Sequence, residues 1–262
     1  MTFSVTILGS NSAIPTLQRN PSAHLLNVNE RIFLLDCAEG TQLQLRKYKI
    51  HFQRIRHVFI SHLHGDHYYG LIGFLTTLHL LGRKERMHIY APPMLEEIIG
   101  LQLEASQTQL LFPVTFHPLV SDELQTIFED ERVVAQSFPL WHSVSTFGFL
   151  FREKIKVRKV DRKRAYAYCS DTAYDERIIK YIREVDLLYH EATFLQDMAG
   201  AAREKLHSTT LEAATIALKG RVKKLLIGHF SARYDDLQPL LEEARSVFPE
   251  TWLAEDGTTF KL

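Results

Sequence analysis

The sequence predicts an α/β fold in which two mixed β-sheets face each other and helices cover their outer faces, a four-layer αββα sandwich. Strand-like runs alternate with amphipathic helical stretches in the N-terminal half and again in the C-terminal half, so each half can supply one sheet. The chain has 262 residues, of which 45% are hydrophobic, which suffices for one sizeable core. Because no repeat, low-complexity segment or linker divides it, we expect residues 1–262 to form a single domain.

Short apolar runs in the N-terminal half have the length and composition of strands. These runs are "FSVTIL" (3–8), "HLLNV" (24–28), "RIFLLDC" (31–37), "HVFIS" (57–61) and "MHIYA" (87–91). Helical spacing appears over 39–48, where Leu43 and Leu45 are expected to face inward, and again over about 66–82 and 94–106. The segment 114–152 is mostly strand-like.

The C-terminal half alternates strands and helices in the same way. The predicted elements are the strand "YAYCS", the helix "ERIIKYI", the strand "DLLYH", the helix "TLEAATIALK", the strand "KKLLIGHF" and the helix "LQPLLEEARSVF". Strand followed by helix is the order that builds a sheet with helices packed on its face.

Charge and cysteine content limit the possible functions. Lys+Arg and Asp+Glu each number 31, so the formal net charge is zero and any affinity for phosphate must be local. The two cysteines, Cys37 and Cys169, are too few for a disulfide framework and suit a reducing cytosol. The start "MTFSVTILGS" does not resemble a signal peptide, and no apolar run approaches the roughly 20 residues of a membrane span. We therefore expect a soluble cytoplasmic protein without membrane contact.

The segment "ISHLHGDHYYG" places His62, His64, Asp66 and His67 directly after a buried strand. Imidazole and carboxylate groups suit zinc, and they also suit manganese or iron. Alternate residues of an extended loop point the same way, so His62 and His64 can share one ion while Asp66 and His67 hold a second. Gly65 allows the backbone to turn tightly between the two pairs. The alternative interpretation is a polar loop in which the histidines occur by chance.

Three more ligand-type residues follow strand-like runs downstream. His142 comes after "VVAQSFPLW", Asp171 ends "AYAYCSD", and His229 lies in "KKLLIGHF". Each of them alone could be a structural residue. Their shared position at strand ends, where sites in α/β folds form, favours a two-metal site with Asp171 as the bridging carboxylate.

The segment "SHLHGDH" is the signature of the metallo-β-lactamase superfamily, and the chain as a whole resembles the ribonuclease Z family. The segments that carry this resemblance are "LGSNSAIPTLQRNPSAHLL", "LLDCAEGTQLQL", "WHSVSTFGF", "YCSDT", "YHEATF", "HST" and "GHFSARY". Ala38 stands where the family usually has glycine. The resemblance covers nearly the whole chain, and it implies the metallo-β-lactamase fold.

The resemblance also implies two divalent metal ions, with Zn²⁺ expected first and Mn²⁺ or Fe²⁺ as alternatives. The implied ligands are His62, His64 and His142 for one ion, Asp66, His67 and His229 for the other, and Asp171 as the bridge. The family reaction hydrolyses an RNA phosphodiester, releasing the 3′ trailer of precursor tRNA and leaving a 3′-hydroxyl. Since family members are commonly homodimers, the resemblance implies a homodimer here.

Three residues are expected to take part in proton transfer. Asp66 can ligate a metal and accept a hydrogen bond from the attacking water. Glu191 and His207, in the two short boxes, can protonate the leaving group, because the carboxylate orients the imidazole and raises its pKa. The alternative for this pair is a helix cap and a solvated histidine. Ser231 and Arg233 are candidates to contact the substrate phosphate, or else they have a structural role.

The chain departs from the family between His142 and Asp171. Family members of this length class usually carry a long arm there, rich in glycine and proline, that grips tRNA. This interval is only 29 residues long and contains no such insertion. It holds instead the basic segment 152–164, with eight Lys/Arg against two acidic residues, which reads as a short hairpin. The hairpin is either a phosphate-binding patch or an edge strand protected by charge.

Four functions therefore compete. The first is a ribonuclease Z-type endonuclease, and the second is an arm-less phosphodiesterase acting on small or cyclic phosphodiesters. The third is a non-catalytic binding protein, which the complete ligand set and the Glu191–His207 pair disfavour. The fourth is another hydrolase of the superfamily, such as a lactamase or thioesterase, which Asp171 and the two short boxes disfavour.

Overall fold

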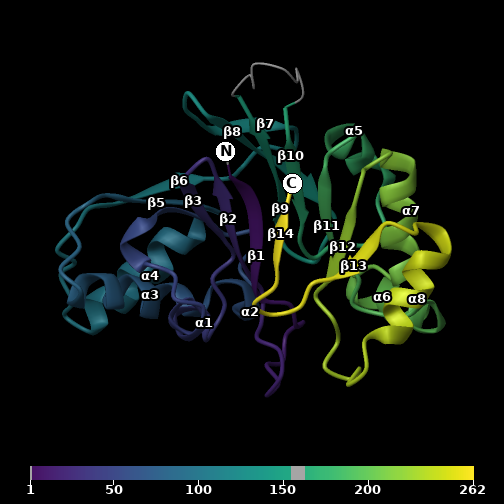
Figure 1. Ribbon diagram of the computed structural model, residues 1–262. Helices are drawn as coiled ribbons and strands as arrows, with labels where there is room; N and C mark the ends of the chain where they lie inside the picture. Colours follow the sequence, from purple (N-terminus) through teal and green to yellow (C-terminus); the bar gives the residue numbers. More distant parts are fainter. Residues whose placement is uncertain (1, 155–162) are drawn as a thin grey trace.

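Two seven-stranded sheets pack face to face in the computed structural model, which describes residues 2–154 and 163–262. Helices lie outside both sheets, so the molecule has four layers, and the predicted α/β sandwich is confirmed (Figure 1). The predicted basic hairpin falls largely on residues 155–162, which lie outside the described residues.

The first sheet has the strand order β14-β1-β2-β3-β4-β5-β6. Its strands are β1 (Phe3–Gly9), β2 (Ala23–Val28), β3 (Arg31–Leu35), β4 (Ile55–Phe59), β5 (Met87–Ala91), β6 (Val114–Pro118) and β14 (Thr259–Lys261). The strands from β3 to β6 are parallel, so the C-terminal ends of β3 and β4 lie at one edge. β14 pairs with β1, which places the two ends of the chain side by side.

The second sheet has the order β13-β12-β11-β10-β9-β8-β7. Its strands are β7 (Gln125–Glu129), β8 (Val133–Leu140), β9 (Thr146–Glu153), β10 (Ala165–Cys169), β11 (Leu187–Glu191), β12 (Leu225–Gly228) and β13 (Thr251–Leu253). The strands from β10 to β13 are parallel, and β8 runs in the same direction because both β8 and β10 pair antiparallel with β9. The C-terminal ends of β8, β10, β11 and β12 therefore meet at one edge.

The helices divide between the two outer faces. They are α1 (Thr41–Lys47), α2 (Gly65–Tyr68), α3 (Gly70–Leu80), α4 (Met94–Ala105), α5 (Ile179–Ile182), α6 (Ala199–Lys205), α7 (Thr210–Gly220) and α8 (Gln238–Val247). In the part of the chain that the structure describes, short 3₁₀ turns cover Phe52–Arg54, Glu176–Ile178 and Gln196–Met198. In Figure 1, α1, α3 and α4 lie on the side of the first sheet, and the helices from α5 to α8 lie on the side of the second.

Two details of the predicted helices differ from the structure. The stretch 66–82 forms two helices, α2 and α3, that meet at Tyr69. Leu45 is buried as expected, but Leu43 is 67% exposed, so the prediction for Leu43 was wrong. Because positions two apart on an α-helix point about 200° apart, the two leucines cannot share one face.

Three apolar layers hold the sandwich together. The layer between the sheets contains Phe33, Phe59, Phe149, Phe151, Tyr168 and Tyr189. One outer layer packs Leu71, Phe74 and Leu75 of α3 on the first sheet. The other packs Ala213, Ile216 and Ala217 of α7 on the second. Each fully buried large apolar side chain adds about 1.5–3 kcal/mol to the free energy of unfolding. This packing therefore holds the two sheets together at the edge where their strand ends meet.

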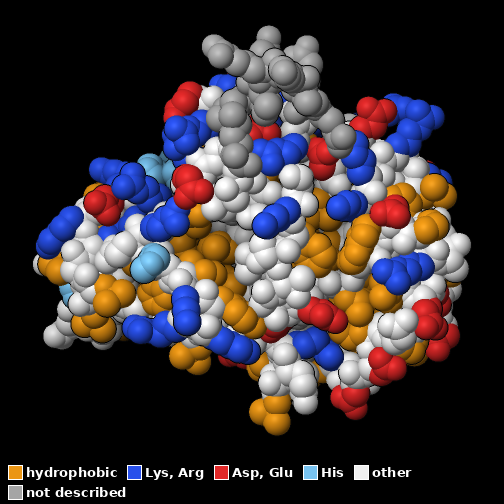
Figure 2. Space-filling model, in the orientation of Figure 1, with side chains coloured by type: hydrophobic (Ala, Val, Ile, Leu, Met, Phe, Trp, Pro, Cys, Tyr) orange, Lys and Arg blue, Asp and Glu red, His pale blue; other side chains and the backbone are white. Residues whose placement is uncertain are grey.

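The surface matches the balanced charge of the sequence. On the face in Figure 2, Lys and Arg side chains are spread over both halves of the molecule, and Asp and Glu side chains are interspersed with them. This face therefore presents no large field of a single sign. Among the described residues, no helix has both the length and the apolar character needed to cross a bilayer.

Candidate active site

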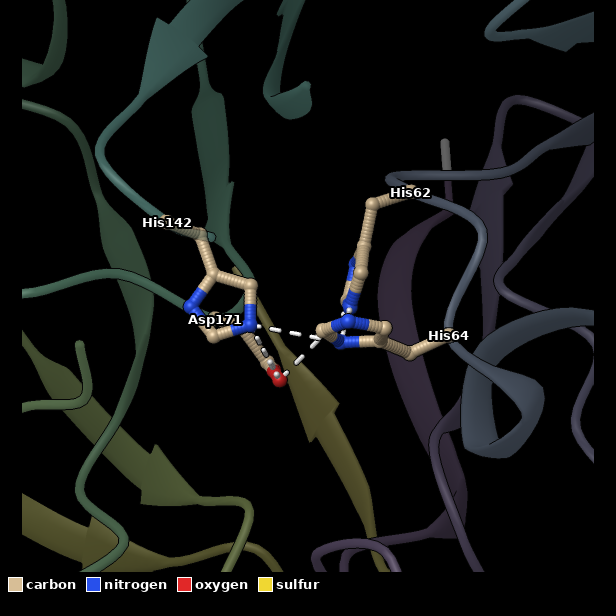
Figure 3. A group of neighbouring side chains, drawn as sticks. All are labelled: His62, His64, His142 and Asp171. Carbon is tan, nitrogen blue, oxygen red and sulfur yellow. Dashed lines mark hydrogen bonds and ion pairs between the residues drawn. The ribbon is translucent and has the colours of Figure 1, made fainter. Parts of the chain in front are cut away.

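Strand ends bring all seven predicted ligand residues to the edge between the two sheets. His62 follows β4 of the first sheet, whereas His142, Asp171 and His229 follow β8, β10 and β12 of the second. In Figure 3, His62 and His64 enter from one side and meet His142 and Asp171 coming from the other. Because both sheets contribute ligands, the site exists only when the sandwich is assembled.

His62, His64, His142 and Asp171 form the first group of donors. Nδ1 of His64 lies 3.0 Å from Nε2 of His62 and 3.3 Å from Nε2 of His142. Oδ2 of Asp171 is 3.7 Å from Nε2 of His62 and 3.8 Å from Nε2 of His142. Four donor atoms thus surround one small space, as the ligands of a single ion must.

Asp66, His67, His229 and Asp171 form the second group. Nε2 of His67 is 3.4 Å from Oδ2 of Asp66 and 3.3 Å from Oδ1 of Asp171. Nε2 of His229 is 3.5 Å and 3.2 Å from the same two oxygens. Asp171 therefore presents Oδ2 to the first group and Oδ1 to the second, which is the arrangement of a bridging carboxylate.

The donor set fits divalent metal ions. Within the described part of the chain, the buried atoms Nε2 of His67 and Oδ1 of Asp171 have no hydrogen-bond partner, although they lie 3.3 Å apart. Buried polar atoms without a partner are rare, and a cation between these two would satisfy both. Imidazole nitrogen and carboxylate oxygen suit Zn²⁺, Mn²⁺ and Fe²⁺. The edge between the sheets is thus a divalent metal site.

Charge within the site favours ionised carboxylates. Burial alone would raise the pKa of Asp171, but the imidazoles of His229 and His67 outweigh burial and hold that pKa well below its usual range. Burial would lower the pKa of His67, yet the carboxylates of Asp171, Asp66 and Asp36 raise it above its usual value. Because protons occupy positions that a cation would take, metal affinity falls as the pH falls.

Asp36 holds the His67 ring in place through a hydrogen bond. It follows β3 in a left-handed conformation (φ 54°), and its buried carboxylate accepts hydrogen bonds from the Ser61 N–H and the Tyr168 hydroxyl, both at 2.7 Å. Nδ1 of His67 donates to Oδ2 of Asp36 at 2.8 Å, which leaves Nε2 free to face the metal site. Asp36 was not among the predicted site residues, although a lone aspartate at the end of an apolar strand is a visible signal in the sequence.

Two more ligands are held by hydrogen bonds with residues that were not predicted as part of the site. Nδ1 of His142 donates to the carbonyl oxygen of Leu206 at 2.9 Å. Nδ1 of His229 lies 2.9 Å from Oγ1 of Thr193. Leu206 and His229 both adopt left-handed backbone conformations, with φ of 55° and 60°. Non-glycine residues rarely take this conformation, so the fold enforces it at the site.

Glu191, the last residue of β11, is fully buried and accepts five hydrogen bonds. Its Oε1 accepts from Nδ1 of His207 at 2.9 Å and from the backbone N–H groups of Ser208 and Thr172 at 3.0 and 3.1 Å. Its Oε2 accepts from the backbone N–H and the hydroxyl of Thr193 at 3.0 and 2.8 Å. Burial would raise the pKa of Glu191, but the charge and hydrogen bond of His207 and the charge of His229 lower it, so the carboxylate is ionised.

His207 carries a proton at neutral pH. Burial would lower its pKa, but the Glu191 carboxylate outweighs burial and raises that pKa to about 9. Because Nδ1 is bound to Glu191, Nε2 is the nitrogen left for substrate. Thr209, two residues after His207, is the N-cap of α7 and forms a capping box with Glu212. This box fixes the loop that carries His207.

A cavity of about 310 Å³ opens onto the site. Six of its lining residues were predicted site residues: His64, Asp66, His142, Asp171, His207 and His229. Ser12, Ala13 and Lys205 also line it and were not predicted. The Ala13 N–H donates to Oδ2 of Asp66 at 2.8 Å and so orients that carboxylate. The ammonium group of Lys205 is exposed and has no ion pair with any described residue, so it is available to an anion.

Ser231 and Arg233 do not line this cavity. Nε of Arg233 donates to Oγ of Ser231 at 3.1 Å, and its guanidinium lies 5.1 Å from the centre of the Phe194 ring. The expected contact of these two residues with substrate phosphate stays a prediction, whereas among the described Lys and Arg residues Lys205 lines the cavity.

Comparisons with known proteins agree with the fold and the site. The family model described as Anti-Pycsar protein Apyc1 matches residues 3–246. Ribonuclease Z from Bacteroides fragilis is 38% identical, with 99% of each chain covered. Ribonuclease Z from Azobacteroides pseudotrichonymphae is 41% identical over 97% of this chain and 96% of that one. The crystal structure of human tRNase Z, short form, covers 98% of both chains at 34% identity with a TM-score of 0.85.

The fold and the site define a metal-dependent hydrolase of the metallo-β-lactamase fold, a fold shared with YhfI from Bacillus subtilis (21% identity, TM-score 0.81). More narrowly, the chain belongs to the ribonuclease Z family and falls within the Apyc1 family model. It is an endoribonuclease-type hydrolase, as the sequence resemblance predicted.

Proposed function

We propose that this protein hydrolyses RNA phosphodiesters with two divalent ions, Zn²⁺ first among the candidates, and removes the 3′ trailer of precursor tRNA. The observation that carries the proposal is the bridging geometry of Asp171 beside the Glu191–His207 pair. Ribonuclease Z relatives at about 38% identity over their full length support the substrate. Divalent ions in such a site activate water and stabilise charge on a phosphate.

The residues of the site would bind the ions, orient water and donate a proton. His62, His64 and His142 would hold one ion, and Asp66, His67 and His229 the other. Asp66 lies against both His67 and His229 and lines the cavity, so its carboxylate can also accept a hydrogen bond from water. On the other side, His207 presents Nε2 to the cavity and can donate the proton that a leaving 3′-oxygen needs.

A second candidate function is hydrolysis of small or cyclic phosphodiesters by the same site. The alignment with the Bacteroides fragilis enzyme spans 301 positions, whereas this chain has 262 residues, so at least 39 residues of the relative have no counterpart here. The interval from His142 to Asp171 lacks the family's tRNA-gripping arm, and the matching family model is named for Apyc1. A substrate that needs no arm is consistent with these observations.

One assay separates the two functions. Metal-loaded protein is incubated in parallel with precursor tRNA and with bis(p-nitrophenyl) phosphate. We expect a single endonucleolytic cut in precursor tRNA that leaves a 3′-hydroxyl. Cleavage of the small ester with intact precursor tRNA would remove the tRNA assignment and leave the small-phosphodiester function.

We also propose that residues 1–262 act as one domain and that the protein works in the cytoplasm as a homodimer. Apolar packing between the sheets joins the two halves and supports the single domain. Both cysteines are buried free thiols, which suits a reducing compartment. The homodimer rests on the family resemblance, and sedimentation analysis of the purified protein tests it.

A further inference from the structure

We infer that Trp141 forms a stacking platform for a nucleobase of the RNA strand, next to the phosphodiester that is cut. The inference deepens the proposed function and rests on it. Trp141 directly precedes the ligand His142, and its large apolar side chain is 50% exposed. Indole rings that remain exposed beside a site have the face and the rigidity that base stacking requires.

The backbone of Trp141 is fixed to the segment that follows Asp171. Its N–H donates to Oγ1 of Thr172 at 3.2 Å, and its carbonyl oxygen accepts from the N–H of Ala173 at 2.8 Å. Thr172 is also tied to Glu191 through its own N–H. The backbone that carries the indole is therefore joined by hydrogen bonds to the two residues after the bridging ligand Asp171, and through Thr172 to Glu191.

Arg177 lies over one face of the indole. Its guanidinium is 5.9 Å from the centre of the Trp141 ring, within the range of a cation–π contact, so the opposite face is the one that a base can stack on. Asp175 holds that guanidinium, since Nε of Arg177 lies 2.8 and 3.0 Å from its two carboxylate oxygens. The Arg177 side chain is largely exposed, so Asp175, Arg177 and Trp141 together form a contact unit at the surface.

Two exposed apolar residues directly follow cavity-lining residues in the sequence. Ile14 is 64% exposed and follows Ala13, which lines the cavity. Val144 is 40% exposed and follows Ser143, which lines it as well. Bases of an RNA strand can contact such exposed apolar side chains while its phosphates reach Lys205 and the metal site, which is how strand-binding proteins combine stacking with charge.

The test uses variants of Trp141 and RNA substrates that lack one base. Trp141→Ala and Trp141→Phe are compared with Trp252→Phe, the matched control, because the sequence has only two tryptophans. Metal-loaded proteins cleave intact RNA and two RNAs with an abasic nucleotide immediately 5′ or immediately 3′ of the cut. We expect Trp141→Ala to lower kcat/KM on intact RNA at least about fivefold, the lower end of the contribution from base stacking. Trp141→Phe should keep most of the activity.

The loss should vanish on one of the two abasic substrates, because the stacking partner is then already absent. An equal loss on all three substrates would show a purely structural role and overturn the inference, as would no loss on any. Tryptophan fluorescence distinguishes failure of the stacking platform from failure of the proposed function. In Trp252→Phe, Trp141 is the single tryptophan, and a bound RNA strand should quench it. If the unaltered protein cut no RNA, the proposed function would fail, and unquenched Trp141 fluorescence would remove the platform independently.

Discussion

Oγ1 of Thr193 lies 2.9 Å from Nδ1 of His229, so a buried hydroxyl joins a metal ligand to the acid pair. The same hydroxyl donates to Oε2 of Glu191 at 2.8 Å, and it must therefore accept the proton of Nδ1 on His229. This fixes the tautomer in which Nε2 of His229 carries a lone pair toward Asp66 and Asp171. The carboxylate that serves His207 thus also orients a ligand of the second ion.

Thr193→Val should weaken metal binding. The change removes the hydroxyl and keeps the shape, so His229 loses the partner that sets its tautomer and ring orientation. Loss of such outer partners costs about 10–100-fold in metal affinity. Competition of the protein with a chromogenic chelator measures the affinity, and Thr193→Ser should restore it. An unchanged affinity in Thr193→Val would contradict this role.

Asp171→Ala should abolish hydrolysis and strip the site of metal, because each of its carboxylate oxygens faces a different donor group. Elemental analysis of the purified variant gives the metal content per chain. His62→Ala, which removes a ligand of one group only, is the comparison. Full metal content in Asp171→Ala would refute the bridging assignment.

His207→Ala should separate substrates by their leaving groups. A 3′-oxygen of ribose must be protonated as it leaves, and loss of a general acid lowers kcat by about 10²–10⁴-fold. A nitrophenolate leaves readily without a proton, so kcat on bis(p-nitrophenyl) phosphate should change little. Steady-state kinetics on both substrates, with metal content checked in parallel, measure the difference. A loss of the same size on both would exclude the role of His207 as the general acid.

Lys205→Ala should weaken RNA binding, because this cation lines the cavity without an ion pair among the described residues. We expect KM to rise. The plot of log(kcat/KM) against log salt concentration should become shallower, with a slope reduced by about 1, as for the loss of one phosphate contact. Arg203→Ala, two residues away on α6 and outside the cavity lining, is the control. Equal effects of the two variants would point to a general surface charge effect.

His24 should make folding stability depend on pH. Burial, with a contribution from His67, lowers the pKa of His24 to about 3, so the folded protein keeps this ring neutral. The unfolded chain takes up a proton near pH 6.5, so the stabilisation is fully present above that pH and declines as pH falls toward 3. When the pH is lowered from 7 to 5, the free energy of unfolding should fall by about 2 kcal/mol more in the wild type than in His24→Phe. Urea unfolding of both metal-free proteins measures this, and parallel pH curves would contradict it.

The order of elements and the types of ligand residue could be predicted from the sequence because both are encoded by local signals. An apolar run such as "HVFIS" predicts a buried strand, and a histidine cluster directly after it predicts a site at the strand end. Local periodicity predicted burial less well inside the short helix α1, where Leu43 is exposed although it was expected to face inward. Residues two positions apart on a helix point in nearly opposite directions, so Leu43 cannot share the buried face of Leu45.

The sequence by itself determined the class of fold, the donor residues and the metal chemistry they suit. Only the tertiary structure decided which groups hold those donors in place. The contact of His142 with Leu206 joins residues 64 positions apart, and that of Asp36 with His67 joins β3 to α2. Such contacts depend on how the two sheets pack and on which strand ends meet, and no local pattern encodes that packing. For the same reason Lys205, rather than Arg233, lines the cavity.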